Sequence, residues 1–287
     1  MTLPLLALLL AAPDAGFVCA PPVCRTFKTA QAAFAQVLET KPSVLGIGEY
    51  HELEGAPKVR SALKRFTVDL LPLLDGKAGA LVAETWMTTG KCGATEKKAV
   101  QEVKKVTQRP DTTEDELSVM LEKAFDHGLK NHILLLTCAD YQALMDEDGH
   151  LDAEKSLLLV RKLVAEKALE VMEKGEAGPG QKLLVLYGGA VHNDVAPLPD
   201  YTAYAFGPQL SQVTDGGYVE LDLLVPEYVA QDDDLPKEPW FAPAMKLAAQ
   251  GKTVLVSPRP DAHFLFRFGG QRDADRVADA RPQQAAD

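Results

Sequence analysis

Two stretches, SVLGIGEYH at residues 43–51 and KLLVLYGGAVH at residues 182–192, share one pattern: a β-branched and leucine-rich run that leads into Gly-x-x-His. Each apolar run predicts a buried strand, so the motifs Gly48–His51 and Gly189–His192 fall where the strands end. In α/β proteins, reacting groups gather just beyond the carboxyl ends of parallel strands, and glycine allows a sharp turn or a close approach of the backbone. The pair therefore predicts one composite site, the alternative being two unrelated tight turns with incidental histidines.

The surrounding chain predicts strands that alternate with helices, which implies parallel pairing and helical crossovers. Hydrophobic spacing and capping residues predict strands at 43–48, 80–84, 133–140 and 182–187, and helices at 30–38, 57–74, 95–108, 113–128 and 152–174. After Asp194 we expect strands at 201–206, 218–225, 253–256 and 263–268, with one short helix at 243–250. The expected fold class is α/β, with a mostly parallel central sheet flanked by helices and a strand-richer C-terminal part.

Length and charge restrict the classes of function. A chain of 287 residues can form one large domain, and we expect a single α/β domain at residues 26–270, preceded by a signal and cysteine segment at 1–25. The tail at 271–287 has almost no large apolar residue and is expected to be disordered. A net charge of -11, with no basic stripe, argues against a nucleic-acid partner.

The N-terminus predicts export. Residues 3–12 are apolar over a length typical of a signal-peptide core and too short to span a bilayer, so no integral membrane span is expected after signal removal. No Lys or Arg precedes Arg25, which leaves a first buried segment as the alternative. Export favours disulfides, and the expected pairs are Cys19–Cys24 and Cys92–Cys138, the alternative being four free thiols.

Four side chains are expected at one edge of the sheet, namely Glu49, His51, Glu84 and His192, and Asp140 would join them at the exit of the third strand. Such a set supports two chemistries. Two imidazoles and two or three carboxylates can hold a divalent metal that activates water. Without metal, a histidine oriented by a carboxylate can act as general base, while the second histidine serves as acid or oxyanion donor.

Two further residues are candidates for the same edge. Arg60, on the expected helix after His51, can point back and stabilise negative charge, or it can lie on the surface. Tyr50 can act as a ligand or proton donor, or it can simply pack against its neighbours.

These motifs resemble the superfamily that joins Tiki and TraB-type proteins, ChaN-like haem-uptake proteins and erythromycin esterases. The resemblance runs from about residue 44 to residue 194. It rests on the two motifs, on a glutamate that ends the second strand and on an arginine in the following helix: Gly48, Glu49, His51, Glu84, Gly189, His192 and Arg60. A single residue separates Glu49 from His51 where the esterases place two, which favours the Tiki or ChaN-like branches over macrolide hydrolysis.

The resemblance implies incompatible roles, because Tiki-like members are metal-dependent peptidases, the esterases act without metal, and ChaN-like members bind haem. The leading hypothesis is an exported hydrolase that activates water at the two-His, two-Glu site and acts on an amide or ester of a small molecule or peptide. The first alternative is a haem- or metal-binding protein of ChaN-like type without turnover, periplasmic or at the cell surface. The second alternative is an extracytoplasmic interaction protein with an inert site.

Overall fold

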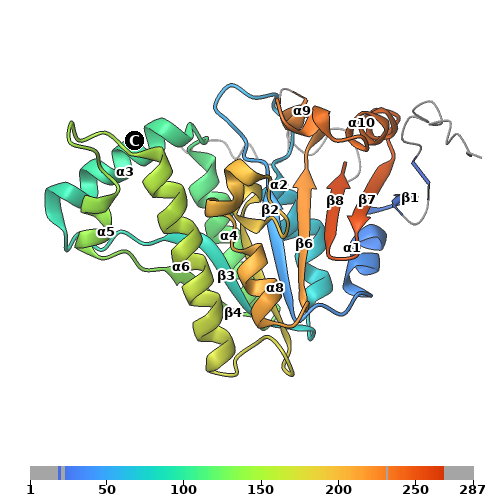
Figure 1. Cartoon of the computed structure of the whole chain (residues 1–287), viewed down its shortest axis with the longest axis horizontal. Coiled ribbons are helices and arrows are strands. Elements are labelled where there is room, and N and C mark those ends of the chain that lie inside the picture. Colours follow the sequence, from blue (N-terminus) through green and yellow to red (C-terminus); the bar gives the residue numbers. More distant parts are fainter. Residues whose placement is uncertain (1–18, 21–22, 231, 268–287) are drawn as a thin grey trace, which may run out of the picture.

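A single mixed sheet organises the computed structural model, which describes residues 19–20, 23–230 and 232–267. Among these residues eight strands pair in the order β1-β7-β8-β6-β2-β5-β3-β4 (Figure 1). Their bounds are β1 Cys24–Phe27, β2 Val44–Glu49, β3 Ala78–Trp86, β4 Lys130–Leu134, β5 Leu183–Gly189, β6 Tyr218–Leu224, β7 Thr253–Arg259 and β8 Ala262–Phe266.

Six adjacent strands, from β8 through β6, β2, β5 and β3 to β4, are parallel to their neighbours. β7 pairs antiparallel with both β8 and β1. Parallel neighbours need long crossover connections, whereas antiparallel strands can be joined by a tight turn, and only two residues separate β7 from β8. The sheet confirms the predicted α/β class and the strand-richer C-terminal part.

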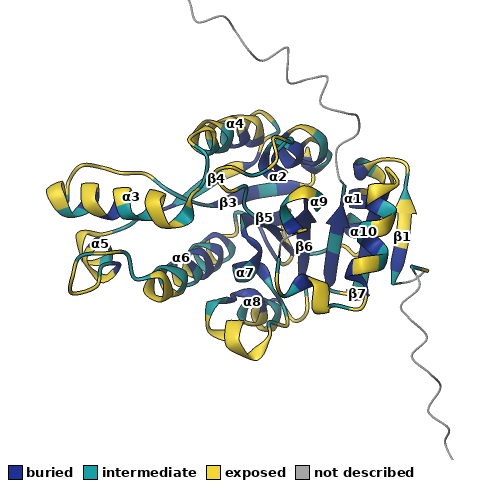
Figure 2. Cartoon of the chain, turned by 90° about the horizontal axis from the view of Figure 1, so that it is seen from above, coloured by how far each residue is buried: buried dark blue, intermediate teal, exposed yellow. Residues whose placement is uncertain are grey.

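Helices cover both faces of the sheet. Figure 2 shows α2 and α4 on one side and α6 and α8 on the other. The α-helices are α1 Ala30–Leu38, α2 Ala62–Arg65, α3 Gly93–Thr107, α4 Thr112–Asp126, α5 Cys138–Ala143, α6 Ala153–Glu173, α7 Ala190–Asn193, α8 Gly207–Val213, α9 Pro226–Val229 and α10 Phe241–Ala249. The other helical segments are the π-helix η1 Phe66–Leu70 and the 3-10 helices η2 Leu71–Leu74, η3 Pro199–Tyr204 and η4 Leu235–Lys237.

The central strands are apolar on both faces because helices pack on each. Successive side chains of a strand point to opposite faces. On β2, Leu45 and Ile47 join the core formed with α1, α2, η1 and α4, while Val44 joins the core under α6 and α8. This two-sided burial explains why the strands read as continuous apolar runs in the sequence.

Most expected elements are present, and three differ for local reasons. The helix expected at 57–74 begins only at Ala62, because the hydroxyl of Ser61 accepts the Lys64 N–H and caps it. The strand expected at 133–140 ends at Leu134, and a capping box between Thr137 and Asp140 starts α5 instead. The strand expected at 201–206 is the 3-10 helix η3, which has a proline in its first turn.

Both expected cysteine pairs are disulfide-bonded. The Cα atoms are 4.8 Å apart in Cys19–Cys24 and 5.2 Å apart in Cys92–Cys138, within the range that a disulfide bridges. Within the described part of the chain, no helix combines the length and apolar character required to cross a bilayer. The expected signal-peptide core at 3–12 and the expected tail at 271–287 lie outside the described residues.

Candidate functional site

The centre of the site is a pair of side chains at the carboxyl end of β2. Glu49 is the last residue of β2 and lies opposite Gly189, the last residue of β5. His51 follows two residues later, and its Nδ1 lies 2.9 Å from Oε1 of Glu49. The carboxylate is 4% exposed and the imidazole 31% exposed, so the glutamate is buried and the histidine is open to a cavity. The two Gly-x-x-His motifs thus begin side by side, as predicted.

Three groups hold Glu49 as an anion. The Arg109 guanidinium pairs with Oε1, and the Tyr187 hydroxyl donates a hydrogen bond of 2.6 Å to Oε2. Burial alone would raise the pKa of Glu49, but Arg109, His51 and Tyr187 together lower it from 4.5 to about 2. Because an ionised carboxylate only accepts hydrogen bonds, Nδ1 of His51 carries the proton toward Glu49. In the neutral ring this leaves the lone pair on Nε2.

Glu84 comes from β3, which pairs with β5 on the side opposite to β2. It is near the end of β3, and its Oε2 accepts the Gly189 N–H at 2.7 Å. A Cβ atom placed on Gly189 would lie 3.1 Å from Nε2 of His51 and 3.7 Å from Oε2 of Glu84. Both side chains therefore occupy the space beside the Gly189 backbone, and the structure brings Glu49, His51 and Glu84 together as predicted.

The structure does not bring His192 to this group. After Gly189 the chain turns at once into α7, and His192 is the third residue of that short helix. Its ring is 2% exposed, and Nδ1 lies 2.8 Å from the carbonyl oxygen of Tyr204. The strand-end position was predicted correctly, but the helical backbone directs this side chain into packed structure instead of the cavity.

Arg60 and Asp140 also lie elsewhere. Arg60 pairs with Asp69, with a nitrogen–oxygen distance of 3.4 Å. Asp140 is exposed and caps the N-terminus of α5, accepting the Thr137 N–H at 2.7 Å. The arginine of the site is Arg109, from the loop between α3 and α4, where the sequence gives no motif to mark it.

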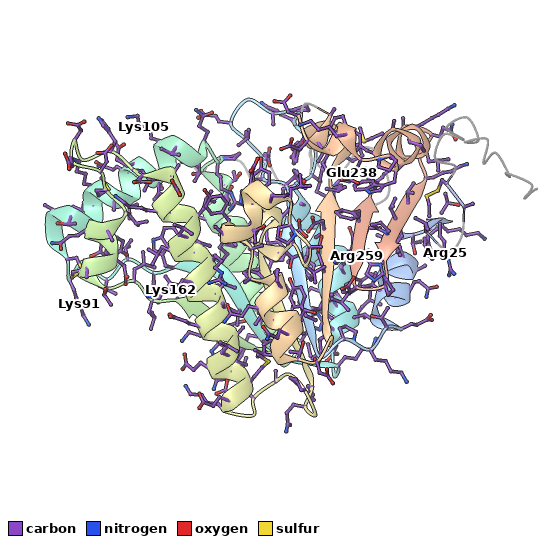
Figure 3. The ribbon with its side chains drawn as sticks, viewed as in Figure 1. Arg25, Lys91, Lys105, Lys162, Glu238 and Arg259 are labelled. Carbon is purple, nitrogen blue, oxygen red and sulfur yellow. A yellow bond between two sulfur atoms is a disulfide. The ribbon has the colours of Figure 1, made fainter. Side chains whose placement is uncertain are left out.

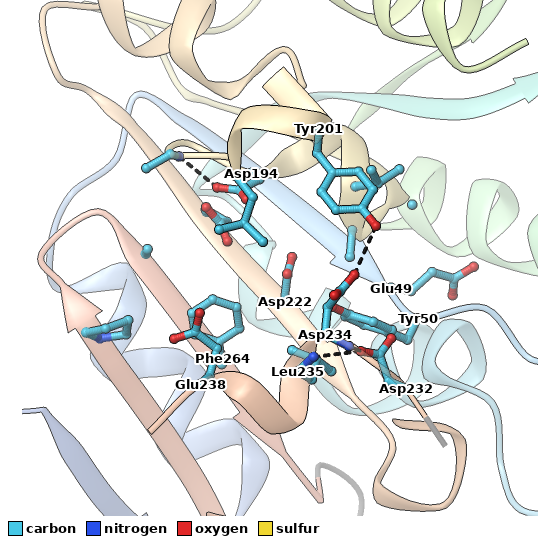
Figure 4. Close-up of a pocket in the computed structure, with 18 of the residues that line it drawn as sticks. Glu49, Tyr50, Asp194, Tyr201, Asp222, Asp232, Asp234, Leu235, Glu238 and Phe264 are labelled. Carbon is cyan, nitrogen blue, oxygen red and sulfur yellow. Dashed lines mark hydrogen bonds between the residues drawn. The ribbon is translucent and has the colours of Figure 1, made fainter. Parts of the chain in front are cut away.

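A cavity of about 530 Å³ opens beside Glu49 and His51 (Figure 4). It lies at the carboxyl ends of β2 and β5, where the fold predicts a binding site, and extends along β6 and β8, whose Glu220, Asp222, Ala262 and Phe264 line it. Tyr50 lines it and is half-buried. Burial and the nearby carboxylates, Asp222 first among them, raise the pKa of the Tyr50 phenol, so the phenol stays protonated. Tyr50 packs against the C-terminal core, as one of the two expectations has it, and a role as ligand or proton donor stays a prediction.

Sequence reasoning missed two acidic residues of the cavity, Glu220 and Asp222, which alternate on β6 and are buried. Oδ1 of Asp222 accepts from Nδ2 of Asn193 at 3.1 Å, and Oε2 of Glu220 accepts from the Val195 N–H at 2.7 Å. Their signal in the sequence is the alternation with Leu221 and Leu223, which places the carboxyl groups on one face of the strand.

A divalent metal does not fit the residues as they are arranged. His192 is turned away, and the carboxylate oxygens of Glu49 are taken up by Arg109, His51 and Tyr187. Across the residues that the structure covers, no group of three or more His, Cys, Asp or Glu side chains is placed to hold a metal ion. The expected metal set of two histidines and two glutamates, with Asp140 as a further member, is therefore not assembled.

Comparison with known proteins gives little guidance. No family model matches the chain, and no curated protein matches it. The chain is similar to the structure of the type III effector HopBA1, at 11% sequence identity and a TM-score of 0.43, over 88% of this chain and 100% of that chain. A likeness at this level supports no functional argument, so the argument for function depends on the site.

Proposed function

We propose that this protein is a hydrolase in which His51, oriented by Glu49, activates water for attack on an ester or amide. The observation that carries the proposal is the 2.9 Å contact between Nδ1 of His51 and the buried Glu49 carboxylate, at the wall of a cavity of about 530 Å³. A carboxylate in this position fixes the tautomer and stabilises the imidazolium that forms during proton transfer. The resemblance of the Gly48–His51 motif to the Tiki and esterase superfamily favours the same reaction class.

In the proposed reaction, Nε2 of His51 accepts a proton from water as the water oxygen attacks the substrate carbonyl carbon. The positive charge on the ring is stabilised by Glu49, which the Arg109 and Tyr187 contacts keep ionised. The tetrahedral intermediate collapses when His51 returns the proton to the leaving oxygen or nitrogen, which breaks the ester or amide bond. Glu84 positions the Gly189 backbone beside the ring through its hydrogen bond to the Gly189 N–H.

Haem binding, the alternative that the ChaN-like resemblance implies, is less well supported by the cavity. Haem carries two propionates, whereas the cavity wall contains several carboxyl groups, of which Glu49 and Asp234 have lowered pKa values and are ionised, and Arg259 supplies the one guanidinium among the lining residues that the structure describes. Bringing the propionates into this wall would place like charges together. The test of this alternative is direct: the purified protein would show a stoichiometric Soret absorbance.

We also propose that the chain acts outside the cytoplasm. Two disulfides, Cys19–Cys24 and Cys92–Cys138, fit an oxidising compartment, and the apolar segment at 3–12 has the length of a signal-peptide core. N-terminal sequencing of the protein recovered from outside the cells should find residues 3–12 removed. Recovery of the intact N-terminus from the cytoplasm, with free thiols, would contradict export.

The experiment for hydrolysis is a screen of the wild-type protein against ester and amide substrates, repeated with two variants. His51→Ala should lose at least about a hundredfold in kcat/KM because the general base is removed. His150→Ala is the matched control, since His150 is 63% exposed and contacts Glu102 away from the cavity. Equal turnover by His51→Ala and wild type would rule out the mechanism, as would absence of turnover across the screen.

A further inference from the structure

The cavity beside His51 has an acidic wall. Seven carboxyl side chains line it, and Arg259 is its one guanidinium among the lining residues that the structure covers. Figure 3 shows Glu238 and Arg259 on the side of β6 and β8, whereas Lys91, Lys105 and Lys162 lie around α3, α5 and α6. The seven carboxyl groups are those of Glu49, Asp194, Glu220, Asp222, Asp232, Asp234 and Glu238.

Some of these carboxyl groups are satisfied by the protein itself. Arg109 pairs with Glu49, and Lys237 donates to Oδ1 of Asp234 at 2.6 Å. Asp232 accepts two backbone N–H groups, from Asp234 and Leu235, through its Oδ1. These contacts account for Glu49, Asp232 and Asp234 without a ligand.

Asp222 and Glu220 are buried, and unlike the buried Glu49 they form no ion pair with a cation of the described chain, although the charge of Arg259 lowers the pKa of Glu220 from a distance. They are 4% and 2% exposed. One oxygen of each is bonded, to Asn193 and to Val195, while Oδ2 of Asp222 and Oε1 of Glu220 have no hydrogen-bond partner within the described ranges of the chain. The guanidinium of Arg259 donates instead to Asp261, at 3.1 Å from Nε. Ionising a buried carboxyl group is costly unless a cation lies beside it, so this pair is suited to a positively charged ligand.

Aromatic rings complete the cavity. Tyr50, Tyr201 and Phe264 line it together with the carboxyl groups (Figure 4), and so does Trp240. The rings of Trp240 and Phe264 are stacked, with centroids 4.5 Å apart. Aromatic faces attract organic cations and are most effective where water is excluded. An ammonium group with attached carbon therefore fits this combination of rings and carboxyl groups better than an anion or a neutral sugar does.

We propose that this cavity binds an organic ammonium group against Asp222 and Glu220, with Tyr50 beside it, and that the substrate class is ammonium-bearing esters or amides. The substrate class rests on the proposed hydrolysis at His51, whereas the ammonium site does not. A volume of about 530 Å³ suits a small organic molecule or a short peptide segment. The ammonium group would sit over β6 and the scissile bond over β2, the adjacent strand in the sheet.

The protonation of the pair agrees with this assignment. Burial raises the pKa of Asp222 to about 8, and burial together with Asp222 and Asp194 raises that of Glu220. At pH 7 Asp222 is therefore mostly protonated, and an ammonium ion beside it would stabilise the ionised form. Binding should therefore release a proton, which titration in buffers of different ionisation enthalpy measures.

The test uses n-butylammonium chloride as probe and the fluorescence of Trp240 as readout, in a Trp86→Phe background because the chain has two tryptophans. We expect saturable binding with a Kd on the order of 1 mM, as befits a five-atom ligand, and no response to butyrate or butanol. Asp222→Asn should weaken binding at least about tenfold, since the amide keeps the shape and the contact with Asn193 but loses the charge. Asp215→Asn, in an exposed turn before β6, is the matched control and should bind normally.

Glu220→Gln provides a second variant, and circular dichroism of each variant confirms that it is folded. Absence of butylammonium binding, or equal binding by wild type and both folded variants, would overturn the ammonium site. Hydrolysis is tested separately with a choline ester and its neutral carbon isostere 3,3-dimethylbutyl acetate, where the expected preference for the cation in kcat/KM is at least about tenfold. Binding of butylammonium with hydrolysis of neither ester would retain the site and reject the hydrolase.

Discussion

Replacing Arg109 with glutamine tests whether Arg109, as the structure indicates, or Arg60, as the sequence motif predicts, is the arginine of the site. Arg109 pairs with the buried Glu49 carboxylate, whereas Arg60, the arginine expected from the motif, pairs with the half-buried Asp69. If Glu49 is the anion on which His51 depends, removal of Arg109 should affect both stability and the protonation of Glu49. Removal of Arg60 should affect neither.

The magnitude follows from the pKa of Glu49. A shift from 4.5 in the unfolded chain to about 2 in the fold corresponds to about 3 kcal/mol of folding free energy at neutral pH. Because the folded-state pKa is the lower one, this stabilisation is present above pH 4.5 and is lost as the pH falls toward 2. Breaking one side of a buried pair costs about 3–5 kcal/mol, and Arg109 is 22% exposed, so we expect Arg109→Gln to cost about 2–3 kcal/mol at pH 7.

Urea unfolding at pH 7 and at pH 4 measures the effect, with Arg60→Gln as control and an expected cost below about 1 kcal/mol. The cost of Arg109→Gln should be smaller at pH 4. Without the guanidinium the pKa of Glu49 rises, so at pH 4 Glu49 binds a proton in the folded variant but stays ionised in the folded wild type. If Arg109→Gln costs no more than Arg60→Gln, or if its cost is the same at both pH values, the ion pair does not control Glu49 and the reasoning fails.

Three further predictions test the disulfide, the buried acids and the second glutamate. Replacing Cys92 and Cys138 with alanine should lower the free energy of unfolding by about 4 kcal/mol in urea, because the bond joins residues 46 apart; an unchanged midpoint would contradict this. Folding raises the pKa of Asp222 from 3.8 to about 8, so the free energy of unfolding should fall as the pH rises between these two values. Asp222→Asn should make this fall smaller and raise the free energy of unfolding by at least about 1 kcal/mol at pH 8. Glu84→Gln can still accept the Gly189 N–H, so stability should change by less than about 1 kcal/mol. The substitution removes a negative charge that lies near the His51 ring and would stabilise its imidazolium form, so kcat/KM should fall by about a hundredfold; unchanged turnover would remove Glu84 from the mechanism.

The positions of the central strands and the central pair of residues could be predicted from the sequence because they depend on local patterns. Apolar runs mark the strands, and residues that directly follow parallel strands must meet at one edge of the sheet. This reasoning places Glu49, His51 and Glu84 correctly. It fails for His192 and Asp140, because a helix that begins two residues earlier rotates each side chain away.

The partners of Glu49 could not be predicted in the same way. Arg109 comes from a loop 60 residues further along the chain, and Tyr187 is one of several apolar or aromatic residues in β5 that point to one face or the other. Only the register of β5 against β2 decides that Tyr187 reaches the carboxylate. Tertiary contacts of this kind leave no signal in a single sequence. The acidic pair of β6 is different, because the alternation of Glu220 and Asp222 with leucines is visible in the sequence.

The glycines of the two motifs explain why polar side chains can occupy the middle of this sheet. Gly48 and Gly189 do not adopt the left-handed backbone conformation that favours glycine, so a sharp turn is not their main role. A Cβ atom on Gly48 would collide with Asp222 and lie 2.7 Å from Cα of Ala190, and one on Gly189 would lie 3.1 Å from Nε2 of His51. Each glycine leaves the space that a functional side chain of another segment fills. The glycine and the histidine of each motif therefore need not act together: Gly189 serves His51 of the first motif, while His192 of its own motif is buried elsewhere.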